Sequence, residues 1–81
     1  MTFEEAIELA RSFIPEYYVL DLGADMGEEY WFNYRRPDGK TIIGASLVSV
    51  TKSSGAVRAL SFTEDFPRIR RTWNSAEKMQ V

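Results

Sequence analysis

Residues Glu28–Gly39 read EEYWFNYRRPDG, and this stretch gives the clearest indication of the fold. Every second residue in its centre carries a ring that can pack into a core: Tyr30, Phe32 and Tyr34. A period of two is typical of a β-strand with one buried face, so Trp31 points to the other face. Pro, Asp and Gly follow in the order that favours a tight turn. The stretch predicts a strand over Glu29–Arg36 and a hairpin turn over Arg36–Lys40, and it raises the question of what covers Trp31.

Helix and strand signals flank this strand on both sides. Thr2 and Glu5 have the spacing of a capping box, so a helix begins after Thr2, and Pro15 ends it at Ile14. Its apolar stripe consists of Phe3, Ala6, Ile7, Leu9, Ala10, Phe13 and Ile14. The other predicted strands are short β-branched or aromatic runs: Tyr17–Leu22, Thr41–Thr51 and Ala56–Phe62. Apolar residues change phase within the third strand, which predicts a bulge near Gly44–Ser46.

The C-terminal part has weaker patterns. Asp65 is a candidate cap for a short helix that has Pro67 in its first turn. Three apolar residues follow at helical spacing: Phe66, Ile69 and Trp73. Residues Asn74–Val81 have little apolar pattern and are expected to fray. We therefore expect one α+β domain over residues 1–81, with the N-terminal helix on one face of a four-stranded antiparallel meander and a short C-terminal helix or tail.

One short helix covers only one face of such a sheet. On the opposite face we expect Tyr17, Val19 and Trp31, and exposed residues of this size form a patch that monomers usually avoid. Two alternatives remain open from the sequence. Either Phe66, Ile69 and Trp73 fold back over Trp31, or another protein chain covers it.

Composition excludes several kinds of chemistry. The chain has 81 residues with no Cys and no His, which removes disulfides, imidazole-based catalysis and the common zinc ligands. No apolar run is long enough to span a membrane, and the acidic start MTFEE is unlike a signal peptide. We expect a cytoplasmic protein with no cofactor, no metal and no catalytic residues.

Charge is unevenly distributed along the chain. Residues 1–30 contain eight acidic residues and one basic residue, a net charge of −7, whereas residues 31–81 have a net charge of +5. Such an asymmetry can steer a charged partner. The acids around the first predicted loop are Asp21, Asp25, Glu28 and Glu29, which favour a basic protein partner over a Ca²⁺ or Mg²⁺ site because their spacing is not that of an EF-hand. The arginines Arg35, Arg36, Arg58, Arg68, Arg70 and Arg71 offer a basic strip, but no nucleic-acid-binding motif accompanies them.

Three segments together resemble a known kind of domain. They are TFEEAIELA at residues 2–10, EYWFNY at residues 29–34 and VSVTKSSGAV at residues 48–57. In this order they resemble small bacterial immunity-protein domains of the Imm35/YrhB-like kind, over Thr2 to about Phe62. The resemblance implies a non-enzymatic protein that neutralises a cognate toxin by binding it.

The first hypothesis is therefore a protein-binding module, an inhibitor that acts on a bacterial toxin. Its predicted partner-binding residues are Tyr17, Asp21, Asp25, Glu28, Glu29 and Trp31. The alternatives are a self-associating domain that forms a homodimer through the open sheet face and, less favoured, a nucleic-acid accessory domain.

Overall fold

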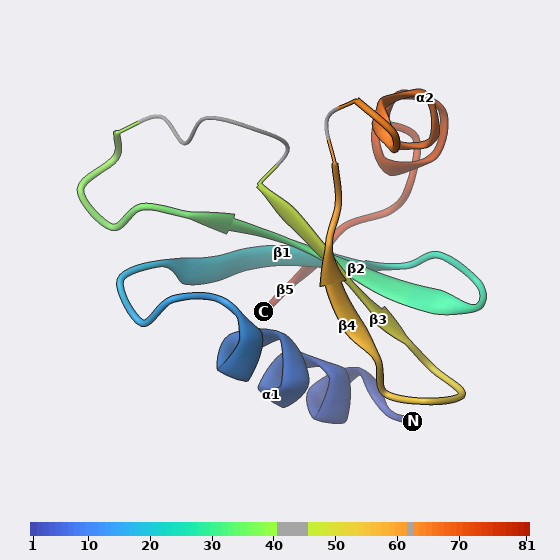
Figure 1. The fold of residues 1–81 in the computed structure, drawn as a ribbon, viewed down its shortest axis with the longest axis horizontal. Helices are drawn as coiled ribbons and strands as arrows, with labels where there is room; N and C mark the ends of the chain where they lie inside the picture. The colour runs from blue at the N-terminus through green and yellow to red at the C-terminus, as the bar shows by residue number, and fades with distance from the viewer. Residues whose placement is uncertain (41–45, 62) are drawn as a thin grey trace.

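The computed structural model describes residues 1–40, 46–61 and 63–81 of the chain. The elements, in chain order, are the helix α1 (Phe3–Phe13), the strands β1 (Val19–Asp25), β2 (Glu29–Arg35), β3 (Leu47–Thr51) and β4 (Val57–Ala59), the short helix α2 (Phe66–Arg68), the π-helical turn η1 (Ile69–Trp73) and the strand β5 (Met79–Gln80). The strands form one antiparallel sheet in the order β4-β3-β2-β1-β5 (Figure 1). This is the α+β fold that the sequence predicts.

The C-terminal end of the chain differs from the prediction. Residues 74–81 were expected to fray, but β5 pairs with β1 through Leu22 opposite Gln80 and Gly23 opposite Met79. The Val81 amide continues this edge by donating to the Asp21 carbonyl at 3.3 Å. The described sheet therefore has five strands rather than four, because main-chain pairing at a sheet edge does not need an apolar side-chain pattern.

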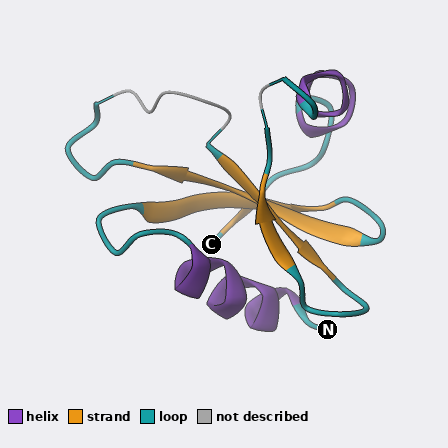
Figure 2. Cartoon of the chain, in the orientation of Figure 1, coloured by secondary structure: helices purple, strands orange, loops and turns teal. Residues whose placement is uncertain are grey.

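The helix α1 begins and ends where the sequence predicts. The Glu5 amide donates to the Thr2 hydroxyl at 3.1 Å, and the Thr2 amide donates to the Glu5 carboxylate at 3.0 Å. At the other end Ile14 is extended, as its position before Pro15 requires. The predicted apolar stripe is too wide, however, because Leu9 and Phe13 remain 37% and 47% exposed. Figure 2 shows α1 running along one side of the sheet.

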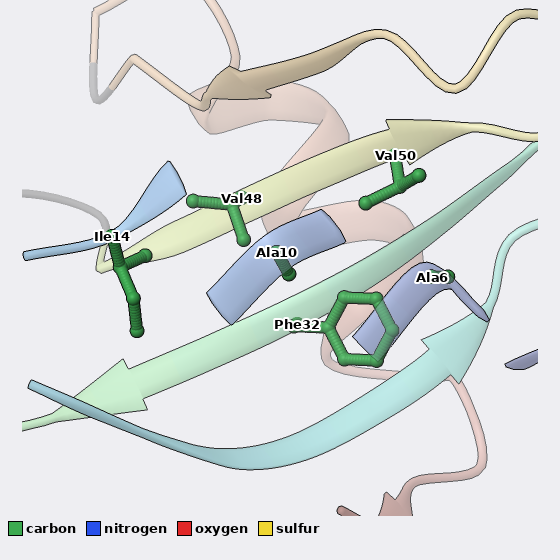
Figure 3. Close-up of a cluster of buried hydrophobic side chains, with 6 residues drawn as sticks. All are labelled: Ala6, Ala10, Ile14, Phe32, Val48 and Val50. Carbon is green, nitrogen blue, oxygen red and sulfur yellow. The ribbon is translucent and has the colours of Figure 1, made fainter. Parts of the chain in front are cut away.

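The main core lies between α1 and the sheet. Its buried members come from one face of the helix and from alternate positions of two neighbouring strands: Ala6, Ala10, Ile14, Phe32, Val48 and Val50 (Figure 3). Tyr18, Leu20, Tyr30 and Tyr34 pack around this cluster, as their alternation predicts. Large rings against small helical residues let the helix approach the sheet closely.

A bulge in β1 changes which sheet face the side chains of its second half occupy. Leu20 lies opposite Tyr34 and Gly23 lies opposite Phe32, so β1 has one residue more than β2 between these pairs. The irregular β1–β2 pairing leaves the Leu22 amide without a main-chain acceptor on β2. This amide donates instead to the Asn33 side chain at 2.7 Å. A Cβ atom on Gly23 would lie 2.7 Å from the Phe32 ring, so this position requires glycine. The bulge predicted near Gly44 lies outside the described residues.

The turn after β2 has the predicted form. The Gly39 amide donates to the Arg36 carbonyl at 3.0 Å, and Gly39 has a φ of 78°, where glycine is favoured. The first strand is displaced relative to the prediction, starting at Val19 and extending to Asp25. It is longer because β2 offers pairing partners as far as Tyr30.

Candidate partner-binding surfaces

Trp31 is covered by the C-terminal part of the same chain. Its side chain is 0% exposed and lies in a second core cluster with Leu47 and Leu60, against which Met26, Ile69 and Trp73 pack. Figure 1 shows α2 and α1 on opposite sides of the sheet. Of the two alternatives left open by the sequence, the intramolecular one is correct for Ile69 and Trp73. The expectation of an open aromatic sheet face at Trp31 was wrong, since both faces are covered there.

Polar contacts fix Trp31 in this buried position. Its indole Nε1 donates to Glu29 Oε1 at 2.8 Å, and the Arg68 guanidinium lies 5.1 Å from the ring centroid. Arg68 also pairs with the second oxygen of Glu29 at 3.5 Å. Glu29 thus bridges a strand and the C-terminal helical segment, so both carboxylate oxygens already have partners within the chain.

The remaining acids of the predicted loop are partly neutralised. Asp25 accepts from the Gly27 amide at 2.9 Å and from the Lys52 ammonium at 2.7 Å. The Lys52 hydrogen bond is the main cause that lowers the pKa of Asp25, and the Gly27 amide adds to it. Glu28 stays exposed beside them. Within the described residues no group of three potential metal-ligating side chains comes together.

Tyr17 and Asp21 lie elsewhere, near the start of β1. The Tyr17 hydroxyl donates to Asp38 Oδ2 at 2.7 Å and accepts from Arg36 Nη2 at 3.1 Å, while Arg36 donates to both oxygens of Asp38. The Lys40 amide, the Tyr17 hydroxyl and the Arg36 guanidinium, in that order, lower the pKa of Asp38 to about 2. This clamp holds the turn before β1 against the turn after β2.

A groove with both apolar and charged lining residues opens at this end of the hairpin. Its volume is about 290 Å³, and its lining residues are Arg11, Ile14, Pro15, Glu16, Tyr18, Val19 and Leu20. Tyr17 and Val19 lie at this end of β1 and remain 51% and 36% exposed. Asp21 is close to Arg35, with 3.9 Å between carboxylate and guanidinium. We call Tyr17, Val19 and the lining residues the hairpin-end surface.

The six predicted partner-binding residues therefore do not form one surface. Asp25, Glu28 and Glu29 gather at the β1–β2 turn, Tyr17 and Asp21 lie toward the opposite end of the same hairpin, and Trp31 is buried between the layers. Sequence reasoning missed the role of Asp38, whose only signal was its place in a turn. Its pairing with Tyr17 joins residues 21 positions apart and depends on how the hairpin closes.

The predicted basic strip is divided in the same way. Four of its arginines contact a carboxylate, in the pairs Arg35–Asp21, Arg36–Asp38, Arg58–Asp65 and Arg68–Glu29. Asp65 was predicted to cap α2, but its carboxylate instead accepts from Arg58 and from the Ser61 amide. Arg70 and Arg71 line an open hollow of about 600 Å³ together with Phe66, Pro67 and Ser75. We call this the α2–η1 hollow.

Comparison with known proteins identified no relative of this chain. No family model matches the chain, and searches of curated proteins and of solved structures gave no significant match. Among the described residues, no helix has the length and apolar character needed to cross a membrane.

Proposed function

We propose that this protein is a non-enzymatic protein-binding module that uses its hairpin-end surface, and that it acts in the bacterial cytoplasm as an immunity protein against a toxin. One observation carries the proposal. Trp31 is covered by Ile69 and Trp73, whereas Tyr17 and Val19 remain exposed at a groove with both apolar and charged lining residues. Tyr is enriched among the residues that anchor protein interfaces.

The geometry of Tyr17 favours binding through its ring. Asp38 and Arg36 hold its hydroxyl, so little side-chain freedom remains to be lost when a partner packs against it. The adjacent groove is lined by Ile14, Pro15 and Leu20 and can take an apolar side chain of the partner. Glu16 and Arg11 also line it and offer charged contacts, which give specificity more than affinity.

The choice of an immunity protein within this class has separate support. It comes from the resemblance of residues 2–10, 29–34 and 48–57 to immunity-protein domains. The acidic excess of residues 1–30 fits a basic toxin, because opposite charge accelerates association. Such a protein needs no catalytic group, since it acts by covering a surface of its target.

The first step of the test is site-specific capture of the partner. A photo-crosslinking amino acid is placed at Val19 in the producing cell, and the matched control carries it at Ser53, an exposed residue in the turn between β3 and β4. We expect one protein to be captured from Val19 and not from Ser53. Equal capture from both positions would exclude the hairpin-end surface.

The second step measures binding and protection with the captured protein. Tyr17→Ala should weaken its affinity by about tenfold or more, the change expected for an interface anchor, whereas Glu28→Ala should leave it within about twofold. Expression of the captured protein alone should arrest growth, and co-expression with this chain should restore it. A captured protein that is harmless alone would reject the immunity role but keep the binding role.

A further inference from the structure

The uneven distribution of charged residues along the sequence places opposite charges on opposite sides of the sheet. The helix α1 contains Glu4, Glu5 and Glu8 against a single Arg11 and lies on one side of the sheet. The segment Phe66–Trp73 contains three arginines and no acid, and it lies on the other side. The two outer layers of the domain therefore carry opposite charge.

Ion pairs within the chain leave the basic layer incompletely neutralised. Every Asp and Glu of the sequence falls within residues 1–40, 46–61 and 63–81, so all their carboxylates are described. Arg68 pairs with Glu29, but no carboxylate pairs with Arg70 or Arg71 in that part of the chain. Two adjacent guanidinium groups thus remain available for an external anion.

The α2–η1 hollow combines this charge with apolar surface. Phe66 and Pro67 line it together with the two arginines and Ser75, and its volume is about 600 Å³. An occupant that suits it must offer both carboxylates and apolar side chains. An exposed acidic amphipathic helix has this combination.

The chain itself offers such a helix. Glu4, Glu5 and Glu8 are exposed on α1, and Leu9, which follows Glu8, remains 37% exposed. Because α1 and the α2–η1 hollow lie on opposite sides of the sheet, they cannot meet within one molecule. They can meet between two molecules.

We propose that the α2–η1 hollow of one copy binds the exposed side of α1 of a second copy. Arg70 and Arg71 pair with Glu4 and Glu8 of the second copy, and Leu9 lies against Phe66 and Pro67. Glu8 exchanges its exposed ion pair with Arg11 of its own helix for the new one. The contact joins two different surfaces, so each added copy leaves one of each free, and association continues head to tail. Because the ion pairs are exposed, the assembly is weak and sensitive to salt.

Sedimentation or light scattering of the whole chain tests the first consequence. At about 0.01 M salt, where the Debye length is about 30 Å, the average mass should rise with protein concentration. At about 1 M salt, where the Debye length is about 3 Å, the protein should be monomeric at the same concentrations. A wild-type chain that stays monomeric at low salt, or an assembly that persists at high salt, would overturn the proposal.

Charge reversal tests which residues meet. R70E/R71E and E4R/E8R should each be monomeric at low salt, because each variant presents the same charge on both surfaces. An equimolar mixture of the two should associate again, since each contact then joins opposite charges. The matched control R35E/K40E carries the same change in net charge as R70E/R71E and should associate like the wild type.

Two further results would contradict the proposal. Unchanged association of R70E/R71E would show that the hollow is not the contact, and a mixture that fails to associate would show that α1 is not its ligand. Circular dichroism checks that each variant is folded. If E4R/E8R does not fold, E4Q/E8Q replaces it, because it adds no positive charge near the helix N-terminus and should still reduce association at least severalfold.

Discussion

Trp31→Ala is the substitution that most directly tests the covered sheet face. The side chain is completely buried among Leu47, Leu60, Ile69 and Trp73, and truncation of a buried Trp to Ala typically costs about 3–5 kcal/mol. A domain of this size has a free energy of unfolding of about 4–12 kcal/mol. The variant should therefore lose a large part of its stability or fail to fold.

The loss of stability should appear as a shift of the urea unfolding midpoint. At a urea m value of about 1 kcal/mol/M, a loss of about 3 kcal/mol lowers the unfolding midpoint by about 3 M. Trp31→Phe keeps most of the apolar contact but loses the hydrogen bond to Glu29, and should cost about 1–3 kcal/mol. Val19→Ala, at an exposed position of the same sheet face, should cost less than about 1 kcal/mol.

Urea unfolding followed by far-UV circular dichroism measures all three variants, because that signal does not depend on Trp31 itself. The expected order of destabilisation is Trp31→Ala, then Trp31→Phe, then Val19→Ala. A midpoint for Trp31→Ala within error of that for Val19→Ala would mean that Trp31 is not buried, and the reasoning about the covered face would fail.

Three other perturbations test separate parts of the fold. Gly23→Ala should cost about 1–3 kcal/mol in thermal unfolding, because its Cβ would overlap the Phe32 ring; an unchanged melting temperature would contradict the close packing at the bulge. Thr2→Ala should cost about 1 kcal/mol by removing the helix cap, and wild-type stability would mean that the cap does not form in solution. The pKa of Asp38 is lowered from 3.8 to about 2 in the fold, so its contribution to stability is complete above about pH 4 and is lost as pH falls toward 2. NMR titration should give this low pKa in the wild type and a more ordinary one in Tyr17→Phe; equal values would remove Tyr17 as a cause.

Much of the local structure could be predicted because local chemistry specifies it. The Thr2–Glu5 capping box and Pro15 set the two ends of α1, and the alternation at Tyr30 and Phe32 identifies the buried face of β2. Each of these signals acts between residues a few positions apart. That separation is the range over which helix capping and strand alternation operate.

The candidate sites could be predicted only in part. Tyr17 was found because it stands in phase with Trp31 on the outward face, and its exposure agrees with that reasoning. Trp31 itself was assigned to the same open surface, yet Ile69 and Trp73 cover it. Sequence alternation tells which face a side chain occupies, but it does not tell whether a distant segment returns to that face.

The α+β class, the ends of the first helix, the inward face of the sheet and the excess of acid in the first thirty residues can all be read from the amino-acid sequence. Three features appear only in the folded chain: which charges neutralise one another, the pairing of β5 with β1, and the covering of the second sheet face by Ile69 and Trp73 of η1. The physical reason is that the first group of features depends on neighbours along the chain, whereas the second depends on contacts between residues tens of positions apart. Those contacts form only when the whole chain folds.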